Sequence, residues 1–162
     1  MSELTYTTKD KSAWGPGPWQ EEPDKIQWTD AGTGLPCLIV RSRHLGNLCG
    51  YVGVAEGHPA FGRDYDELGY YPEVHGGLTY AAFCQEGDDA ETICHVPEPG
   101  QPDRVWWLGF DCAHGGDLSP GMEAREREYG LPSFREPYAR YCDVGYVKAE
   151  CRSLARQLAA QT

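Results

Sequence analysis

Short apolar runs, separated by segments rich in glycine and proline, dominate the pattern of this chain and predict a protein built mainly of strands. The turn at 45–47 is short enough to join the first two runs as a hairpin, and the proline-rich segment 97–102 separates the last two. We therefore expect a mainly antiparallel sheet. The expected strands are 35–41, 47–54, 78–84, 92–96 and 104–110.

Helical signals follow the strands. Ser119 and Pro120 suit the cap and first position of a helix that Gly130 would end. A second helix is expected from its cap, Asp143, to about Ala160. Its apolar residues recur at three- and four-residue steps, which predicts a stripe that packs on the sheet; a seam between two copies of the chain is the alternative. The stripe is Val144, Val147, Cys151, Leu154 and Leu158.

The first 34 residues lack a clear period. The segment 14–19 alternates tryptophan, glycine and proline, which excludes a helix interior. We expect 1–34 to wrap over the surface as an arm, held by its tryptophans, and 56–76 to form a long, ordered loop. Together with the expected sheet and helices, this predicts an α+β fold in a single domain over 1–162.

Charge is unevenly distributed. The chain of 162 residues has a formal net charge of −11, and the segment 56–103 holds many acids but a single base, Arg63. Such a surface repels nucleic acid, but it could act as a decoy for a basic host protein. No apolar run is long enough to cross a membrane, and the N-terminus lacks a secretory pattern, so we expect a cytoplasmic protein.

Seven cysteines are spread along the chain without a Cys-x-x-Cys motif. An odd number in a reducing compartment predicts mostly free thiols, most of them buried as small apolar side chains.

Candidate chemistry gathers where the aromatic run at 104–110 ends. The next seven residues include Asp111, Cys112, His114 and Asp117. The His-Gly-Gly of 114–116 has an echo at 75–77, just before the expected strand 78–84. If the two strands pair, both His-Gly-Gly loops would face one cleft.

The function we expect first is binding of a small anionic ligand in that cleft. Successive glycine amides form concave sites for anions, and aromatic rings can stack on a base. The carboxylates of Asp111 and Asp117 would orient the histidines or bind ligand hydroxyls. The expected ligand-binding residues are His75, Gly76, Gly77, Tyr80, Trp107, Asp111, His114, Gly115 and Gly116.

A hydrolase is the alternative, so the sequence leaves open whether the protein is an enzyme. Cys112, His114 and Asp117 could bind zinc, with His75 or Cys84 as a fourth ligand. Cys112 could otherwise be a nucleophile with His75 or His114 as its base. Against both stands the simpler interpretation that these loops only turn the chain.

Two motifs, HGGLTY at 75–80 and WLGFDCAH at 107–114, resemble those of a family of small proteins encoded by bacteriophages and prophages. The resemblance extends over 14–160 and includes YVKAEC at 146–151. It brings no known reaction. It implies a role in the host cytoplasm, such as countering bacterial defence, for example by sequestering a nucleotide immune signal.

Overall fold

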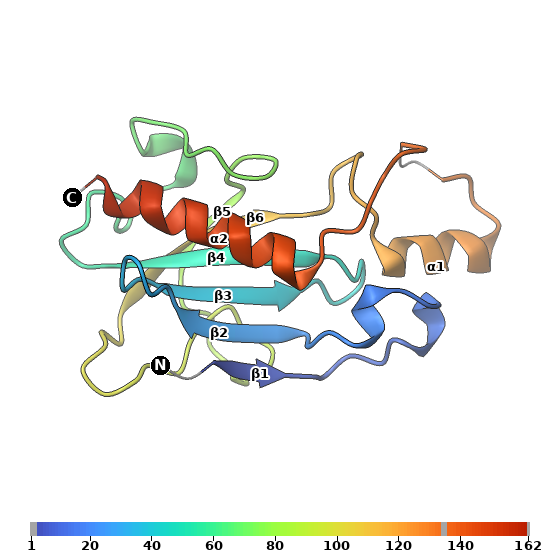
Figure 1. Cartoon of the computed structure of the whole chain (residues 1–162), viewed down its shortest axis with the longest axis horizontal. Coiled ribbons are helices and arrows are strands. Elements are labelled where there is room, and N and C mark those ends of the chain that lie inside the picture. The colour runs from blue at the N-terminus through green and yellow to red at the C-terminus, as the bar shows by residue number, and fades with distance from the viewer. Residues whose placement is uncertain (1–2, 134–135, 162) are drawn as a thin grey trace.

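Residues 3–133 and 136–161 are described by a computed structural model, and six strands among them form one sheet in the order β1-β2-β3-β4-β6-β5 (Figure 1). Every neighbouring pair of strands is antiparallel, which confirms the expected α+β fold with a mainly antiparallel sheet. The strands are β1 (Leu4–Tyr6), β2 (Lys25–Thr29), β3 (Pro36–Arg41), β4 (Leu48–Ala55), β5 (Tyr80–Phe83) and β6 (Val105–Asp111). Short 3-10 turns lie at η1 (Ser12–Trp14), η2 (Pro18–Gln20) and η3 (Tyr65–Glu67).

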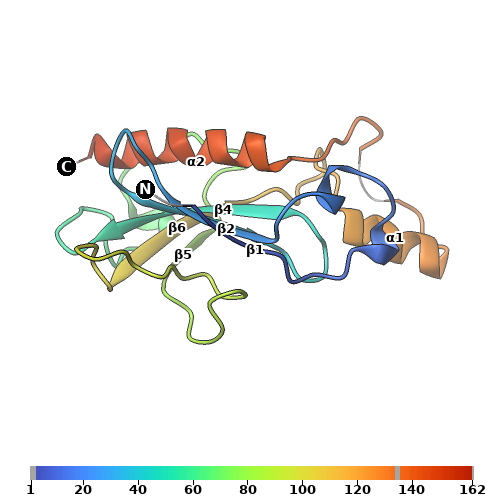
Figure 2. The ribbon, with the colours of Figure 1, turned by 60° about the horizontal axis from the view of Figure 1, so that its bottom comes forward.

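The C-terminal helix α2 (Val144–Ala159) covers one face of the sheet, as its stripe predicts (Figure 2). Val147, Cys151, Leu154 and Leu158 are fully buried against β3 and β4. Gly50 in β4 permits this close approach, because a Cβ there would lie 2.8 Å from the Cys151 sulfur. Removing four such side chains from water is the main term that holds α2 in place.

An irregular segment covers the other face of the sheet, opposite α2 (Figure 2). There Leu38, Tyr51, Val105 and Trp107 form a second, smaller core. The expectation of a strand at 92–96 was wrong. Side chains of β2 take up the backbone groups of this segment in place of a neighbouring strand, since Lys25 donates to two of its carbonyls and Gln27 bonds to both backbone groups of Val96.

The N-terminal segment differs from the arm we expected. β1 and β2 belong to the sheet, with Ile26 of β2 opposite Ile39 of β3. The residues between these two strands lie outside it. They are anchored by the buried Trp19 ring and by the Asp24 carboxylate, which lies 2.7 Å from Arg41 Nε and 2.9 Å from Lys11 Nζ. Tryptophan anchoring was thus expected correctly, but the strands were missed.

The first helix, α1 (Pro120–Tyr129), starts and ends where the sequence predicts. Gly130 ends it in the left-handed conformation with a φ of 63°. Ser119 precedes it without a side-chain capping bond. Within the described part of the chain, neither helix has the length and apolar character needed to cross a membrane.

Candidate functional site

Three segments that are far apart in sequence meet at one end of the sheet. His75 comes from the loop before β5, Cys112 and Asp117 follow β6, and Cys142 precedes α2. Cys112 continues the alternation of β6, so its side chain is buried on the α2 face beside Phe110. The backbone amide of Cys112 still donates to Leu48 of β4, at 3.2 Å, which holds this side chain on the sheet.

The imidazole of His75 is the centre of this cluster. Its Nε2 lies 2.9 Å from each carboxylate oxygen of Asp117 and 3.9 Å from Cys142 Sγ. Cys142 Sγ is also 3.5 Å from Asp117 Oδ1. The ligating atoms of His75, Cys112 and Cys142 all lie within 4.8 Å of one another. A nitrogen, two sulfurs and a carboxylate thus converge on one small volume.

A tight turn places the second histidine over Asp117. The Asp117 amide donates to the His114 carbonyl at 2.9 Å, and the His114 amide donates back to Asp117 Oδ2 at 3.0 Å. The ring of His114 stands 5.7 Å from the ring of His75, measured between centroids. Both His-Gly-Gly loops therefore face one place, as the sequence suggested.

Gly76 allows these rings to lie so close. It adopts a φ of +68°, and a Cβ there would lie 2.1 Å from Cε1 of His114. Gly77 shares the left-handed conformation but has no atom within 4 Å of such a Cβ. Gly76 is thus required both by its positive φ and by the His114 ring beside it, whereas Gly77 is required only by its positive φ in the turn.

The start of α2 orients His75 from the opposite side. Tyr146 Oη lies 2.8 Å from His75 Nδ1, and Glu150 accepts the His75 backbone amide at 2.9 Å. Burial, with the Glu150 charge, raises the pKa of Tyr146 to about 12, so the phenol stays neutral. Such outer partners fix the ring and the tautomer of a ligating histidine.

Two acidic groups of the cluster have shifted pKa values. Burial alone would raise the pKa of Asp117, but hydrogen bonds from His75 and from the His114 amide outweigh it and lower this pKa. A hydrogen bond with Cys142, followed by burial, raises the pKa of the Cys112 thiol far above its ordinary value. Cys112 is therefore neutral at neutral pH unless a cation takes the place of its proton.

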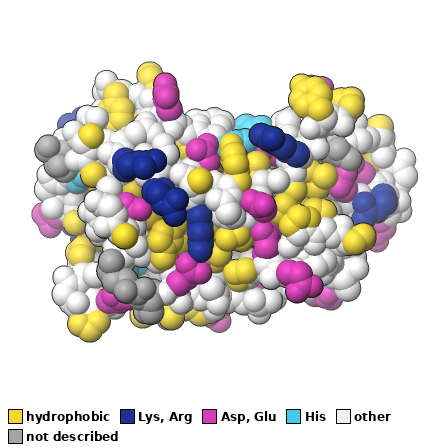
Figure 3. All heavy atoms as spheres, viewed as in Figure 1, with side chains coloured by type: hydrophobic (Ala, Val, Ile, Leu, Met, Phe, Trp, Pro, Cys, Tyr) yellow, Lys and Arg dark blue, Asp and Glu magenta, His cyan; other side chains and the backbone are white. Residues whose placement is uncertain are grey.

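An open cleft of about 490 Å³ lies above the cluster. His75, His114 and Asp117 form its floor, and Arg140 and the exposed Tyr138 contribute to its lining. Figure 3 shows histidine side chains reaching the surface next to a basic side chain on this face. A smaller hollow of about 210 Å³ adjoins it and reaches α1; His114, Gly115 and Asp117 are among its lining residues.

The structure brings most of the expected site residues together. His75, Gly76, His114, Gly116 and Asp117 line the larger cleft, and Gly115 lines the smaller one. Asp111 lies at the margin, with its carboxylate 3.7 Å from His114 Nδ1. Gly77 turns the chain beside the cleft without lining it, and Cys112 lies buried in the cluster.

Three other candidates lie elsewhere. Trp107 is fully buried in the second core, where Tyr80 packs beside it. Both rings are on the face of the sheet opposite α2, since β6 alternates sides and Leu108 and Phe110 face the helix. Cys84 forms a disulfide with Cys94. The alternative in which Cys84 is the fourth zinc ligand beside Cys112, His114 and Asp117 is therefore incorrect for this structure.

Five residues of the site and its cleft were not predicted from the sequence: Cys142, Tyr146, Glu150, Arg140 and Tyr138. Cys142 precedes the helix cap Asp143 in an otherwise ordinary stretch, and no spacing links it to Cys112. Tyr146 and Glu150 are four residues apart on α2, so they share a helix face. That spacing was the one signal available in the sequence. It indicates a site only once the loop that carries His75 is known to pack against this face of α2.

Part of the acidic segment has a structural role. Glu91 pairs with Lys9, and Asp88 accepts the Ala90 amide at 2.8 Å. These carboxylates order their own loop, so they are not simply a free charged face.

Comparison of the chain with protein-family models, with curated proteins and with solved structures found no match. The resemblance to phage proteins therefore stays a prediction.

Proposed function

We propose that this protein binds a zinc ion through His75, Cys112 and Cys142, and that the bound metal holds a small anionic ligand in the cleft above. The observation that supports this most is that the ligating atoms of His75, Cys112 and Cys142 all lie within 4.8 Å of one another, with His75 Nε2 3.9 Å from Cys142 Sγ. In tetrahedral zinc sites, neighbouring nitrogen and sulfur ligands lie about 3.5 Å apart, given the usual bond lengths.

The donor set suits zinc chemically. Two thiolates and a neutral imidazole balance the charge of a divalent ion, and zinc prefers these ligands to an all-oxygen set. Zinc would take the place of the Cys112 proton, which otherwise leaves only at high pH. The Nε2 hydrogen that bonds to Asp117 would have to leave on zinc binding, so the neutral ring would carry its proton on Nδ1 and donate it to Tyr146, with the Nε2 lone pair on the metal.

A cysteine nucleophile fits the arrangement less well. In a Cys-His-Asp relay the base uses one ring nitrogen for the thiol and the other for the carboxylate. Here Asp117 and Cys142 both contact Nε2, and Tyr146 occupies Nδ1. Groups that converge on the same ring nitrogen can chelate an ion together. They cannot form a proton relay, which needs the thiol and the carboxylate on different nitrogens of the ring.

The anionic ligand is inferred from what surrounds the metal position. Arg140 and His114 supply hydrogen-bond donors among the residues that line the cleft, and such donors suit a phosphate or carboxylate. The exposed Tyr138 ring could stack on a base. A nucleotide-like ligand, as sequestered in phage defence evasion, would use both groups, and this remains part of the proposal.

Hydrolysis is the second candidate function. Asp117 lies beside the fourth metal position and holds an ionised carboxylate against His75, so it could accept a proton from a metal-bound water. The same site would then cleave the ligand rather than store it.

Metal analysis of the purified protein tests the proposal first. In protein whose Cys84–Cys94 disulfide is intact, we expect about one zinc per chain, lost in Cys112→Ser and Cys142→Ser but kept in Cys49→Ser, whose thiol lies outside the cluster. Cobalt substitution should give the full thiolate-to-cobalt charge-transfer band in the wild type and in Cys49→Ser, but not in Cys112→Ser or Cys142→Ser. Zinc binding that is unchanged by both serine variants would overturn the metal site.

Ligand binding is then measured by calorimetry with zinc-loaded protein, using inorganic phosphate and a panel of mono- and dinucleotides. Heat of binding without product supports a binder, whereas product detected by chromatography supports a hydrolase. Equal binding before and after removal of zinc would show that the anion does not depend on the metal.

A further inference from the structure

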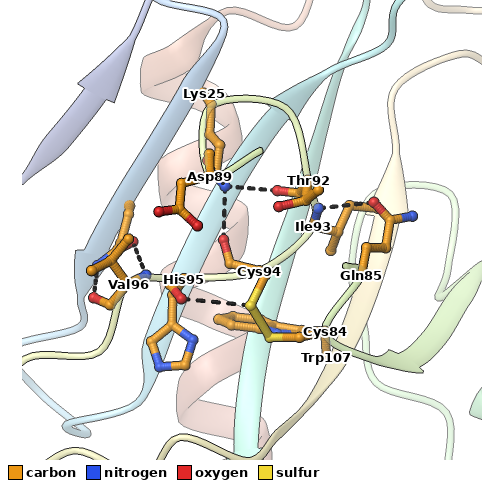
Figure 4. Close-up of a disulfide and its surroundings, with 11 residues drawn as sticks. Lys25, Cys84, Gln85, Asp89, Thr92, Ile93, Cys94, His95, Val96 and Trp107 are labelled. Carbon is orange, nitrogen blue, oxygen red and sulfur yellow. Dashed lines mark hydrogen bonds between the residues drawn. A yellow bond between two sulfur atoms is a disulfide. The ribbon is translucent and has the colours of Figure 1, made fainter. Parts of the chain in front are cut away.

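A second group of metal-ligating side chains lies on the opposite face of the sheet, around the disulfide between Cys84 and Cys94 (Figure 4). Cys84 directly follows β5, and Cys94 lies in the segment that covers the second core. The ligating atoms of Cys84, Cys94 and His95 all lie within 4.8 Å of one another. This group shares no residue with the cluster at His75.

His95 is the unusual member of this group. Its side chain is buried, with 5% of the residue exposed, and packs edge-on against Trp107. Among the residues that the structure describes, neither ring nitrogen has a hydrogen-bond partner of normal geometry. Burial lowers its pKa, although the nearby Pro102 carbonyl opposes the shift, so the ring is neutral. A buried imidazole without a partner is costly, which suggests that a partner is present in another state of the protein.

The segment around the disulfide is held in place by more than the disulfide. The buried Lys25 ammonium donates to the carbonyls of Thr92 and Cys94, at 2.7 and 2.8 Å. Gln85 bonds to Ile93 through both its side chain and its backbone. These bonds do not depend on the oxidation state of sulfur, so the two cysteines should stay side by side after reduction.

We propose that reduction of the Cys84–Cys94 disulfide creates a second zinc site, in which both thiolates and one ring nitrogen of His95 bind the ion. A dithiol or phosphine reductant supplies two electrons and is itself oxidised, and two protons complete the two thiols. Zinc then displaces these two protons as it binds. The disulfide form cannot bind zinc in this way, because its sulfurs are bonded to each other.

Two further features support a thiolate site here. The indole Nε1 of Trp107 donates to Cys84 Sγ at 3.3 Å, a bond that would stabilise a thiolate. The carboxylates of Asp88, Asp89 and Glu91 lie close enough to act on the charge of Lys25. They offset the repulsion that this ammonium would exert on a metal ion.

Native mass spectrometry of oxidised and phosphine-reduced protein, each equilibrated with zinc, tests this directly. Reduced wild type should carry one more zinc per chain than oxidised wild type. The extra ion should be absent from His95→Ala and from Cys94→Ser, and present in Cys49→Ser. Cys94→Ser changes one atom of a half-buried side chain and should fold normally. Loss of the extra zinc in this variant therefore could not be attributed to a folding defect such as His95→Ala might have.

The two sites can be told apart. A Cys112→Ser/Cys142→Ser variant should still gain one zinc per chain on reduction. The second site can therefore be tested even if the first site does not bind zinc. No increment in the wild type, or the same increment in His95→Ala and Cys94→Ser, would overturn it.

Discussion

The imidazole of His75 lies against the carboxylate of Asp117, with Nε2 2.9 Å from both oxygens, although 42 positions separate the two residues in the chain. Asp117 in turn accepts the His114 amide and contacts its ring. One buried carboxylate therefore aligns both histidines of the two His-Gly-Gly loops. This alignment leaves Cys142 on the remaining side of His75 Nε2 and completes the proposed metal site.

The phenol that supports His75 gives a first prediction. Tyr146→Phe removes the bond at Nδ1 and should weaken zinc binding by about 10- to 100-fold, the usual effect of losing an outer partner. Competition with a fluorescent chelator measures this. Tyr71→Phe, at an exposed ring, is the matched control and should change nothing. An unchanged zinc affinity in Tyr146→Phe would mean that His75 is not a ligand through Nε2.

The two glycines at 76 and 77 give a second prediction. Alanine at either position must adopt a positive φ, at a cost of about 1–2 kcal/mol in the free energy of unfolding. Only Gly76→Ala also places a methyl group against the His114 ring, which should swing out of the cleft. We therefore expect similar stability losses in the two variants but weaker anion binding in Gly76→Ala alone. Equal affinities in calorimetry would argue against a role for His114.

Arg140 gives a third prediction. Arg140→Gln should weaken binding of a phosphate-bearing ligand by about 1.5–3 kcal/mol, the range for bonds to charged groups, while zinc content stays the same. Arg125→Gln, on the exposed side of α1, makes the same charge change away from the cleft. If both variants lose affinity equally, only the overall charge matters, and Arg140 does not contact the ligand.

The buried ion pair of the N-terminal segment gives a fourth prediction, on stability. Asp24→Asn removes the carboxylate that the buried Arg41 and Lys11 share and leaves Arg41 its longer pair with Glu22, at 3.4 Å. It should lower the free energy of unfolding by about 3–5 kcal/mol at neutral pH. Exposed Asp66→Asn is the control and should stay within about 0.5 kcal/mol. Urea unfolding measures both.

The pH dependence of this loss follows from the pKa of Asp24. Burial alone would raise that pKa, but bonds from Lys11, the amides of Lys9 and Thr8, and Arg41 lower it overall. A lowered pKa in the folded state adds stability above the unfolded value, about 3.9, and this is lost as pH falls through the folded value. The difference in the free energy of unfolding between wild type and Asp24→Asn should therefore become smaller below about pH 4. A difference in the free energy of unfolding that stays constant as the pH falls below about 4 would contradict this role for Asp24.

Much of the fold could be predicted because its signals are local. The runs that became β3, β4 and β6 are apolar enough to be recognised alone, and α2 has both a cap at Asp143 and a continuous stripe. β2 was missed because it includes Lys25 and Gln27, which are buried by virtue of partners in a distant loop. The segment 92–96 was mistaken for a strand because its alternation is strand-like, but its backbone partners are side chains.

The candidate site divides in the same way. The repeated His-Gly-Gly and the expected pairing of the strands beside it were enough to suggest that His75 and His114 share a cleft. Tyr80 and Trp107 were placed in that cleft from their type, whereas the strand alternation that puts them on the other face depends on which face α2 covers.

The sequence by itself determined the α+β class, both helices and the two loops that carry the histidines, since each depends on neighbours within a few residues. The tertiary structure decided which sulfur joins His75, because Cys142 reaches it from 67 positions away. It also decided that Cys84 pairs with Cys94. Contacts of this kind depend on how α2 and the covering segment pack on the sheet. Hydrophobic periodicity reports the local structure of each segment, but it does not report which distant segments touch.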